Sequence, residues 1–451
     1  MPRSLVMNIK LEKAVERLLA RAKAYGADGA DAACVDRKSL SASVRLGKLE
    51  GVESEESRSA GLRVVIGQKQ AGASTSDFSD GALDTLADRV VAMAKAAAED
   101  PYCGITDASE LATNQVDLGL WDNTEADIAA LEARALACEE GALAIKGVSN
   151  SGGSGADWGA SQVLYGASNG FRGFYRGTSW GLGLSAIAGE GDDKERDWNS
   201  DSARFLNGLR DPIGIGKEAG ERAVARLGGT KLDSCTAPVI FEHRMAGRLI
   251  GTLLGGISGT AIARGISFLR EKLGQQIFAK GITISDDPLK QGGWSSHPFD
   301  GEGRAVTARN IIEDGVLTTW LLNGASARQL GLTSTGHASL NPGGSPGVGS
   351  SNVRLHPGSR DLAGLMTDAG TGLMVIETLS PSFNANTGDY SVGVSGLWFE
   401  KGVIVRPVNE ITVAGNMLDI FATLIAGSDN QGRSSLDCPS LLIPSMTIAG
   451  A

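Results

Sequence analysis

The chain has 451 residues, of which 42% are hydrophobic and 21% are charged, so it can bury substantial cores and is not a disordered chain. Its 42 basic and 52 acidic side chains give a formal net charge of −10, and no Lys/Arg block stands out. This charge disfavours nucleic-acid binding, which needs a broad cationic surface. Glycine is the outlier, with 62 residues, roughly twice its usual share. It indicates many turns between many strands.

Five cysteines are spread through the chain, at Cys34, Cys103, Cys138, Cys235 and Cys438. They include no C-x-x-C pair, which fits a reducing compartment. The first residues carry charges every few positions and lack the apolar core of a signal peptide. No run of about 18 uncharged apolar residues predicts a membrane span. We therefore expect a cytoplasmic protein without a membrane partner, with about two or three domains.

The first half of the chain predicts an α+β domain over residues 1–230. Within 8–25, apolar residues recur at three- and four-residue spacing, as on one face of a helix. Three further segments predict helices, namely 80–100, 124–144 and 212–229. Residues 30–78 and 148–190 run as short strand-like stretches separated by glycine-rich and charged turns, which is typical of antiparallel strands. We expect helices packed on a curved antiparallel sheet.

A composition shift at 228–236 marks the predicted domain boundary. The second domain, 236–451, opens with a short strand and the helical pattern of residues 242–251, and its later part consists mostly of short strands. Residues 341–352, "NPGGSPGVGSSN", predict a long loop, and such a loop inside a domain is usually functional or mobile. A late helix is predicted over 414–427. We expect a strand-rich domain around a buried helix.

Motifs that carry chemistry are sparse. His297, His337 and His356 lie on predicted loops without an H-x₃₋₅-H partner, so we interpret them as surface or hydrogen-bonding residues. Asp300 and Glu302 share the turn "PFDGEG", where paired carboxylates could do acid–base chemistry. We favour a role in holding that turn through backbone N–H groups. There is no phosphate loop and no nucleophile elbow with triad partners.

Small residues alternate in "TGDYSVGVSG", which contains Asp389, Tyr390 and Ser391. Such alternation suits a strand whose backbone is exposed along one side. A peptide could add to that edge by main-chain hydrogen bonds, with little dependence on its own sequence. A packed structural strand explains the pattern equally well, so both interpretations stay open.

Four phrases of the second half carry a family resemblance. They are "DDPLKQGGWSSHPFDGEG" (286–303), "IIEDGVLTTWLLNGASARQLGLTSTGHA" (311–338), "NTGDYSVGVSGLWFEKGVIVRPVNEITVAGN" (386–416) and "CPSLLIPSMTIAGA" (438–451). Together they resemble the TldD/TldE (PmbA) family, also known as peptidase U62 or "modulator of DNA gyrase" proteins. The resemblance implies two branches. TldD-like chains carry a zinc-binding H-E-x-x-x-H helix and a distant Cys ligand, and they cut peptides. TldE/PmbA-like chains lack that site and pair with a TldD-like chain.

The zinc motif is degenerate in this chain. When its glycine is placed on Gly247 of "EHRMAGRLIG", the first His falls on His243. The Glu then falls on Arg244 and the second His on Arg248. A catalytic zinc needs three protein donors and a carboxylate base. Arginine supplies neither, because it stays protonated. We therefore predict no catalytic residue and no metal site here, and expect zinc only in a TldD-like partner.

Cys438 does not replace the missing ligand. The family's Cys lies in a loop that reads "NQGRSSLD" here, at residues 430–437, without a cysteine. We interpret Cys438, directly before Pro439, as a small packed residue. Whether Arg244 and Arg248 have gained another role, such as holding a substrate carboxylate, stays open.

These features predict a non-catalytic TldE/PmbA-like subunit that shapes a substrate chamber with a TldD-like partner and acts on unfolded peptides. The assembly is expected to be a heterodimer, or a homodimer when the chain is alone. The alternative is a non-proteolytic binding or regulatory protein of a gyrase-linked factor. An autonomous hydrolase ranks last, because the sequence offers no convincing triad or metal cluster.

Overall fold

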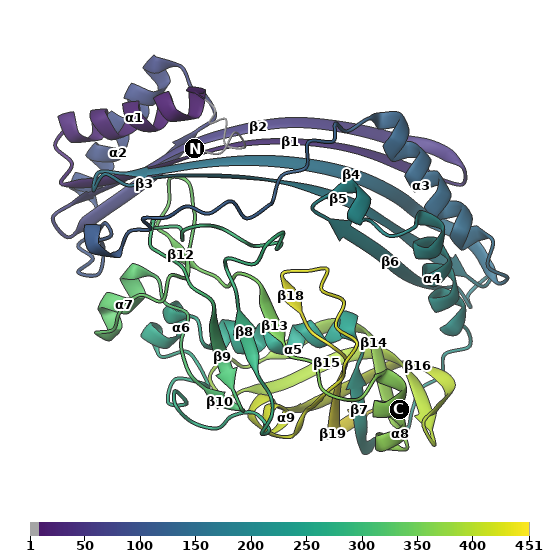
Figure 1. The fold of residues 1–451 in the computed structure, drawn as a ribbon. Coiled ribbons are helices and arrows are strands. Elements are labelled where there is room, and N and C mark those ends of the chain that lie inside the picture. The colour runs from purple at the N-terminus through teal and green to yellow at the C-terminus, as the bar shows by residue number, and fades with distance from the viewer. Residues whose placement is uncertain (1–8, 451) are drawn as a thin grey trace.

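The computed structural model describes residues 9–450, so position 8 of the first predicted helix lies outside it. Strands β1 to β6 form one six-stranded sheet that arches over the C-terminal half of the chain (Figure 1). We call this sheet the arch. The α-helices of the N-terminal half lie on its outer side. No helix among the described residues is long and apolar enough to cross a membrane.

The arch is antiparallel, in the order β3-β2-β1-β4-β5-β6. Its strands are β1 (Gly29–Arg45), β2 (Lys48–Ile66), β3 (Lys69–Thr75), β4 (Val148–Ala167), β5 (Arg172–Ala188) and β6 (Glu195–Ala203). Four of them have 17 to 20 residues, about three times the usual length. Over such a length the right-handed twist of the strands accumulates into pronounced curvature.

The β1–β2 hairpin turns through Leu46 and Gly47, whose φ angles are 50° and 72°. Two positive φ angles are typical of a type I′ turn, whose twist matches that of the paired strands. Leucine is strained in this region. The buried carboxylate of Glu139, on helix α3 (Ile128–Leu143), accepts both turn N–H groups at 2.9 and 2.7 Å. The helix therefore stabilises the hairpin.

Side chains alternate between the two faces of the arch. The outer face packs its apolar residues against two pairs of helices, α1 (Ile9–Ala24) with α2 (Asp80–Ala96) and α3 (Ile128–Leu143) with α4 (Pro212–Ala225). The inner face presents small and polar residues, including Ser39, Ser41 and Ser43 of β1 and Ser179, Gly181 and Gly183 of β5. The arch is thus closed by helices outside and hollow inside.

All four helices lie within their predicted segments. The second ends at Ala96, short of the predicted end at residue 100. Three of them begin at capping side chains, because Ser79, Asp127 and Asp211 each accept a backbone N–H from the first helical turn.

The C-terminal half contains a closed barrel. Its strands are β7 (Cys235–Phe241), β14 (Gly372–Phe383), β15 (Asp389–Glu400), β16 (Val403–Asn416) and β19 (Leu441–Ala449), with β17 (Ile425–Ala426) beside β19. They pair in the order β16-β15-β14-β7-β19, and β19 pairs with β16 to close the ring. Helix α5 (His243–Gly256) follows β7 and buries one face, including Leu249 and Leu253, in the core that the barrel residues share.

A smaller sheet has the order β10-β9-β8-β13-β18, and β11 pairs with β12. These strands are β8 (Ile284–Asp286), β9 (Arg309–Glu313), β10 (Val316–Leu317), β11 (Ala338–Ser339), β12 (Gly347–Val348), β13 (Val353–Leu355) and β18 (Leu436–Asp437). The remaining helices are η1 (Ala108–Glu110), η2 (Leu206–Gly208), α6 (Gly259–Arg264), α7 (Gly324–Leu330), α8 (Leu362–Ala369) and α9 (Met417–Thr423).

This architecture confirms the predicted α+β fold, with helices on a curved antiparallel sheet and a strand-rich half around a helix buried along one face. The late helix is shorter than predicted. Residues 414–416 still belong to β16, and only 417–423 are helical. The side chain of Asn416 accepts the N–H of Leu418, so the cap that starts the helix lies inside the predicted segment.

The glycine-rich loop 341–352 joins the two halves of the molecule. A Cβ added at Gly61 of β2 would stand 2.1 Å from the backbone N of Gly343, and one at Gly72 of β3 would stand 2.4 Å from its carbonyl O. The three backbones therefore approach more closely than any side chain allows. The loop is not wholly irregular, because its residues 347–348 form the short strand β12. Glycine here permits contact between segments far apart in sequence.

Gly61→Ala is expected to lower the free energy of unfolding by about 1–3 kcal/mol, because overpacking forces the loop away from β2. Urea denaturation measures this as a lower midpoint. Gly81→Ala, in helix α2, is the matched control, since an added Cβ there meets nothing within 4 Å. Equal midpoints for the two variants would contradict the docking of the loop.

Candidate functional site

Helix α5 begins with the positions to which the resemblance assigned the zinc motif. The Nη1 of Arg244 lies 2.8 Å from Asp197 Oδ1 on β6, and its Nη2 lies 2.8 Å from Glu242 Oε2. These side chains are 8%, 2% and 9% exposed, respectively. Arg244 therefore joins the barrel half to the edge strand of the arch, and its guanidinium is already engaged by two carboxylates.

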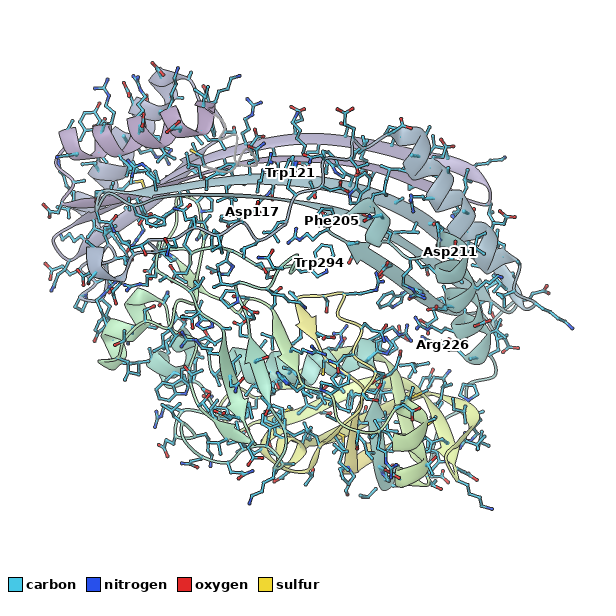
Figure 2. All side chains as sticks on the ribbon, in the orientation of Figure 1. Asp117, Trp121, Phe205, Asp211, Arg226 and Trp294 are labelled. Atoms are coloured by element: carbon cyan, nitrogen blue, oxygen red, sulfur yellow. The ribbon has the colours of Figure 1, made fainter. Side chains whose placement is uncertain are left out.

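A second arginine reaches β6 from the loop in which the family's Cys ligand was expected. Arg433 Nη1 lies 2.9 Å from each carboxylate oxygen of Asp201, whose side chain is buried. At the end of α4, Arg226 adds ion pairs with Glu195 and Glu377, where the arch meets the barrel half (Figure 2). Both segments of the degenerate motif thus bind the same strand.

His243 is tied to acids at the start of the helix. Its Nδ1 lies 3.3 Å from Glu242 Oε1 and 3.7 Å from Asp429 Oδ2. Its backbone N–H donates to Ser440 Oγ, whose hydroxyl donates to Asp429 at 2.7 Å. Burial lowers the pKa of the imidazole, and the two carboxylates oppose that effect. The arrangement anchors the first turn of α5.

The residues of this region do not fit a catalytic zinc. Among residues 9–450, no three His, Cys, Asp or Glu side chains are grouped so that they could hold a metal ion. Cys438 is buried, its Sγ lies 3.4 Å from the carbonyl O of Pro439, and burial raises the pKa of the thiol. A thiol held neutral is a poor ligand. Cys438 is packed, as predicted.

The peptide-binding edge considered for Asp389, Tyr390 and Ser391 is wrong. Strand β15 is paired with β16 throughout this stretch, and Tyr390 and Ser391 also pair with β14. No backbone edge is left at those two residues for a peptide to join. Tyr390 is buried, and burial raises the pKa of its phenol to about 12. Tyr390, Val392 and Val394 face the core, and the small residues between them, Ser391 and Gly393, are half-buried on the other face of the strand.

Arg248 differs from Arg244, although both lie on α5. It is exposed and forms no hydrogen bond or ion pair with any residue of the described part of the chain. The two arginines at the motif positions therefore have different environments. Arg244 forms a buried contact between the halves, and Arg248, one turn further along the same side of the helix, is exposed.

Cavities lie between the inner face of the arch and the loops of the C-terminal half. The central cavity has a volume of about 440 Å³ and is lined by Arg37, Arg176 and Arg204 together with Trp294 of the facing loop. It adjoins one of about 270 Å³ beside Trp121 and one of about 580 Å³ that also reaches Trp294. Figure 2 shows Trp121 at the level of the arch strands and Trp294 below the arch. These volumes approach or fall within the range of ligand sites.

Sequence reasoning missed this cavity. Its walls come from strands of the first half and loops more than a hundred residues later in the chain. The available signal was weak. It consists of small and polar residues at every second position of β1 and β5, a pattern that marks the face without showing what lies opposite.

Asp300 and Glu302 hold a loop at the cavity wall, as predicted. Asp300 Oδ1 accepts the backbone N–H groups of Glu302 and Arg304, both at 2.9 Å. Glu302 Oε2 accepts that of Gly324 at 2.7 Å. Burial, reinforced by the charge of Glu302, raises the pKa of Asp300 to about 7.

The other histidines are hydrogen-bonded, also as predicted. Their partners are Ser295 for His297, Asp286 and Thr335 for His337, and Ser285 for His356. Asp286 is buried and also accepts the N–H of Ser351 at 3.0 Å. The Asp286–His337 pair thus fixes the loops that face the arch.

Comparison with known proteins identifies the family. Models described as PmbA/TldA metallopeptidase domain 1, central domain and C-terminal domain match residues 30–94, 121–227 and 234–450. Metalloprotease PmbA of Escherichia coli O157:H7 is 36% identical over 442 residues, which cover 98% of this chain and 96% of that protein. The chain belongs to the PmbA/TldD family. The resemblance read from its sequence is confirmed.

Further relatives agree with this family assignment. The Metalloprotease PmbA homolog of Haemophilus influenzae is 34% identical over 98% of this chain and 96% of its own length. Two crystal structures share the fold. A Bacteroides thetaiotaomicron protein named for modulation of DNA gyrase has a TM-score of 0.92 and 24% identity, covering 99% of this chain and all of its own. TldE from Thermococcus kodakarensis has a TM-score of 0.88 and 19% identity, covering 97% and 100%.

Arg244→Met is expected to cost about 3–5 kcal/mol of stability, because it leaves Asp197 and Glu242 buried without their cation. Differential scanning calorimetry measures this as a fall in Tm. Arg248→Met, on the exposed face of the same helix, is the matched control and should change stability by less than about 0.5 kcal/mol. Similar Tm values for the two variants would contradict the bridging role of Arg244.

Asp300→Asn tests whether the buried carboxyl group of Asp300 holds its proton more tightly in the folded than in the unfolded state. The pKa of Asp300 rises on folding from 3.8 to about 7, so the folded state binds more protons between these values. The stabilisation that this gives is complete below about pH 4 and lost as the pH rises through about 7. Between these pH values, the free energy of unfolding of the wild type should fall by at least about 1 kcal/mol relative to that of the variant. Urea unfolding at several pH values measures the difference, and parallel profiles would contradict it.

Proposed function

We propose that this chain is a non-catalytic TldE/PmbA-like subunit of a cytosolic two-chain peptidase, in which a TldD-like partner supplies the zinc, the base and the Cys ligand. The chain closes a chamber around an unfolded peptide as part of a heterodimer, and forms a homodimer when alone. The proposal rests mainly on Arg244, the residue at the position of the motif's glutamate.

The chemistry of Arg244 argues against catalysis by this chain. A guanidinium cannot ligate a metal or accept the proton of a bound water. Its position is also fixed, because Asp197 and Glu242 bind it from two elements. A zinc ion beside it would meet a fixed positive charge at short range. In this proposal, helix α5 keeps its place in the family's fold, but its role here is to hold the two halves of the molecule together.

Peptide binding is supported by the relatives named metalloprotease and by the cavities beneath the arch. The inner face of the arch offers small side chains and polar groups over several strands. Such a surface suits an extended main chain of varied sequence. The alternative, a regulatory role on a gyrase-linked factor, has no residue-level support.

His243→Ala in this chain should leave peptide cleavage by the complex with a TldD-like chain within about twofold of wild type, because interactions that touch no reacting group contribute little to the transition state. Cleavage of an unstructured fluorogenic peptide by the co-purified pair measures this. The control is a zinc-ligand substitution in the partner, which should abolish cleavage. Equal losses from both substitutions would overturn the non-catalytic assignment.

Zinc analysis of the purified chain gives an independent check. After mild dialysis it should hold less than about a tenth of an equivalent, since too few donors converge. Near one equivalent would mean that His243 and Cys438 form a site after all. Gel filtration separates the two candidate functions, because a shift with a TldD-like chain and none with gyrase subunits is expected.

A further inference from the structure

The wall of the central cavity is more basic than the protein as a whole. Arg37 comes from β1 and Arg204 from the segment after β6. Arg176 of β5 also lines the cavity, but it stacks on the Trp121 ring, 4.3 Å from its centre. Burial lowers the pKa of its guanidinium, and the charge of Asp117 opposes that effect. The acid that shares this wall is Asp300, whose carboxylate is occupied by backbone N–H groups. A chain with a net charge of −10 thus carries an excess of positive charge at the centre of its hollow face.

Arg204 keeps its charge without a carboxylate partner. Its guanidinium donates to the carbonyl oxygens of Thr178, at 2.9 Å, Gly293, at 3.2 Å, and Trp294. It also lies 4.9 Å from the centre of the Trp294 ring. Its Nε is buried and has no hydrogen-bond partner. Neutral acceptors and an aromatic ring hold the group in place but do not cancel its charge.

Arg37 is the exposed arginine of the cavity. It forms no hydrogen bond or ion pair with any of residues 9–450. Together with Arg204 it lines both the central cavity and an adjoining cavity of about 440 Å³. The two arginines therefore stand where two hollows meet, one fixed by its contacts and one able to move toward a ligand.

Arginine is suited to carboxylates because its planar donors match the two oxygens of the group. Around the pair, the walls are formed by small residues of the arch such as Ser161 and Gly177, which both cavities share. A narrow chain could lie along such a wall while its charged group meets the arginines. The site is large enough for a few peptide units.

We propose that the central cavity binds a carboxylate group of an extended peptide, which Arg37 and Arg204 receive. This inference rests on the proposed function and names the chemistry that the chamber selects. Arg204 is the preformed part of the site, and Arg37 closes on the ligand. The carboxylate is that of a peptide C-terminus or of an acidic side chain.

Isothermal titration calorimetry with the full chain tests this with three unlabelled Gly/Ser dodecapeptides. One has a free C-terminus, one is amidated, and one is amidated with a central Asp. A free carboxylate should bind at least about fivefold more tightly than the amide, the gain expected for a charge-assisted hydrogen bond. Tight binding of the first peptide alone assigns the C-terminus, and tight binding of the third assigns acidic side chains.

Arg37→Gln should remove the preference while leaving the urea midpoint unchanged, because Arg37 makes no contact that the fold needs. Arg89→Gln is the matched control, since Arg89 is exposed on helix α2, outside the cavities. Equal binding of all three peptides, no binding of any, or a preference that survives Arg37→Gln would overturn the inference.

The outcome is separable from that of the proposed function. If the chain prefers the carboxylate peptides but does not associate with a TldD-like chain, the proposed function is refuted and the carboxylate site stands. Association and cleavage without the preference would refute the site and keep the function. Arg37→Gln should still form the complex, because the residue faces the cavity.

Discussion

The arch depends on being held along both of its edges. At one edge, strand β6 carries buried acids, and arginines of the C-terminal half bind them, as in the Arg244–Asp197 and Arg433–Asp201 pairs. Near the other edge, the backbone of Gly343 lies against β2 and β3. Between these supports, the middle strands touch the C-terminal half where the Phe299 ring packs against Tyr165 of β4 and Tyr175 of β5. The cavities occupy the parts of the inner face that these contacts leave uncovered.

The same helix frame can serve different chemistry within one fold, because a fold fixes positions and leaves the side chains to decide the function. In this chain the apolar face of α5 packs into the barrel core, as a structural helix requires. Its polar face carries Arg244 and Arg248 where the family's other branch is expected to carry a base and a ligand. The apolar burial pattern of α5 is therefore independent of the side chains on its polar face, where Arg244 forms a contact between the two halves.

Local patterns in the sequence predicted what local physics determines. Periodicity and capping residues located the four N-terminal helices. The residue type alone excludes Arg244 as a metal ligand, whatever the fold. The wrong prediction of a free edge and the missed cavity both concern which segment lies next to a given residue in the fold. Whether Tyr390 stands at an edge depends on β14 and β16, and the central cavity depends on β1, with Arg37, lying opposite the loop of Trp294. Strand order and the docking of the halves arise from contacts between distant segments, and periodicity does not record them.

The barrel can close only late in synthesis, because β19 is the last of its strands to be made. Strand β7 precedes α5 in the chain, but its neighbour β19 follows every other barrel strand, and β19 also completes the ring with β16. Until residues 441–449 have left the ribosome, β7 and β16 each keep an unpaired edge and the apolar side of α5 lacks part of its cover. Open edges beside apolar surface invite pairing with other chains. The nascent C-terminal half therefore carries two open strand edges beside apolar surface until its final strand is made.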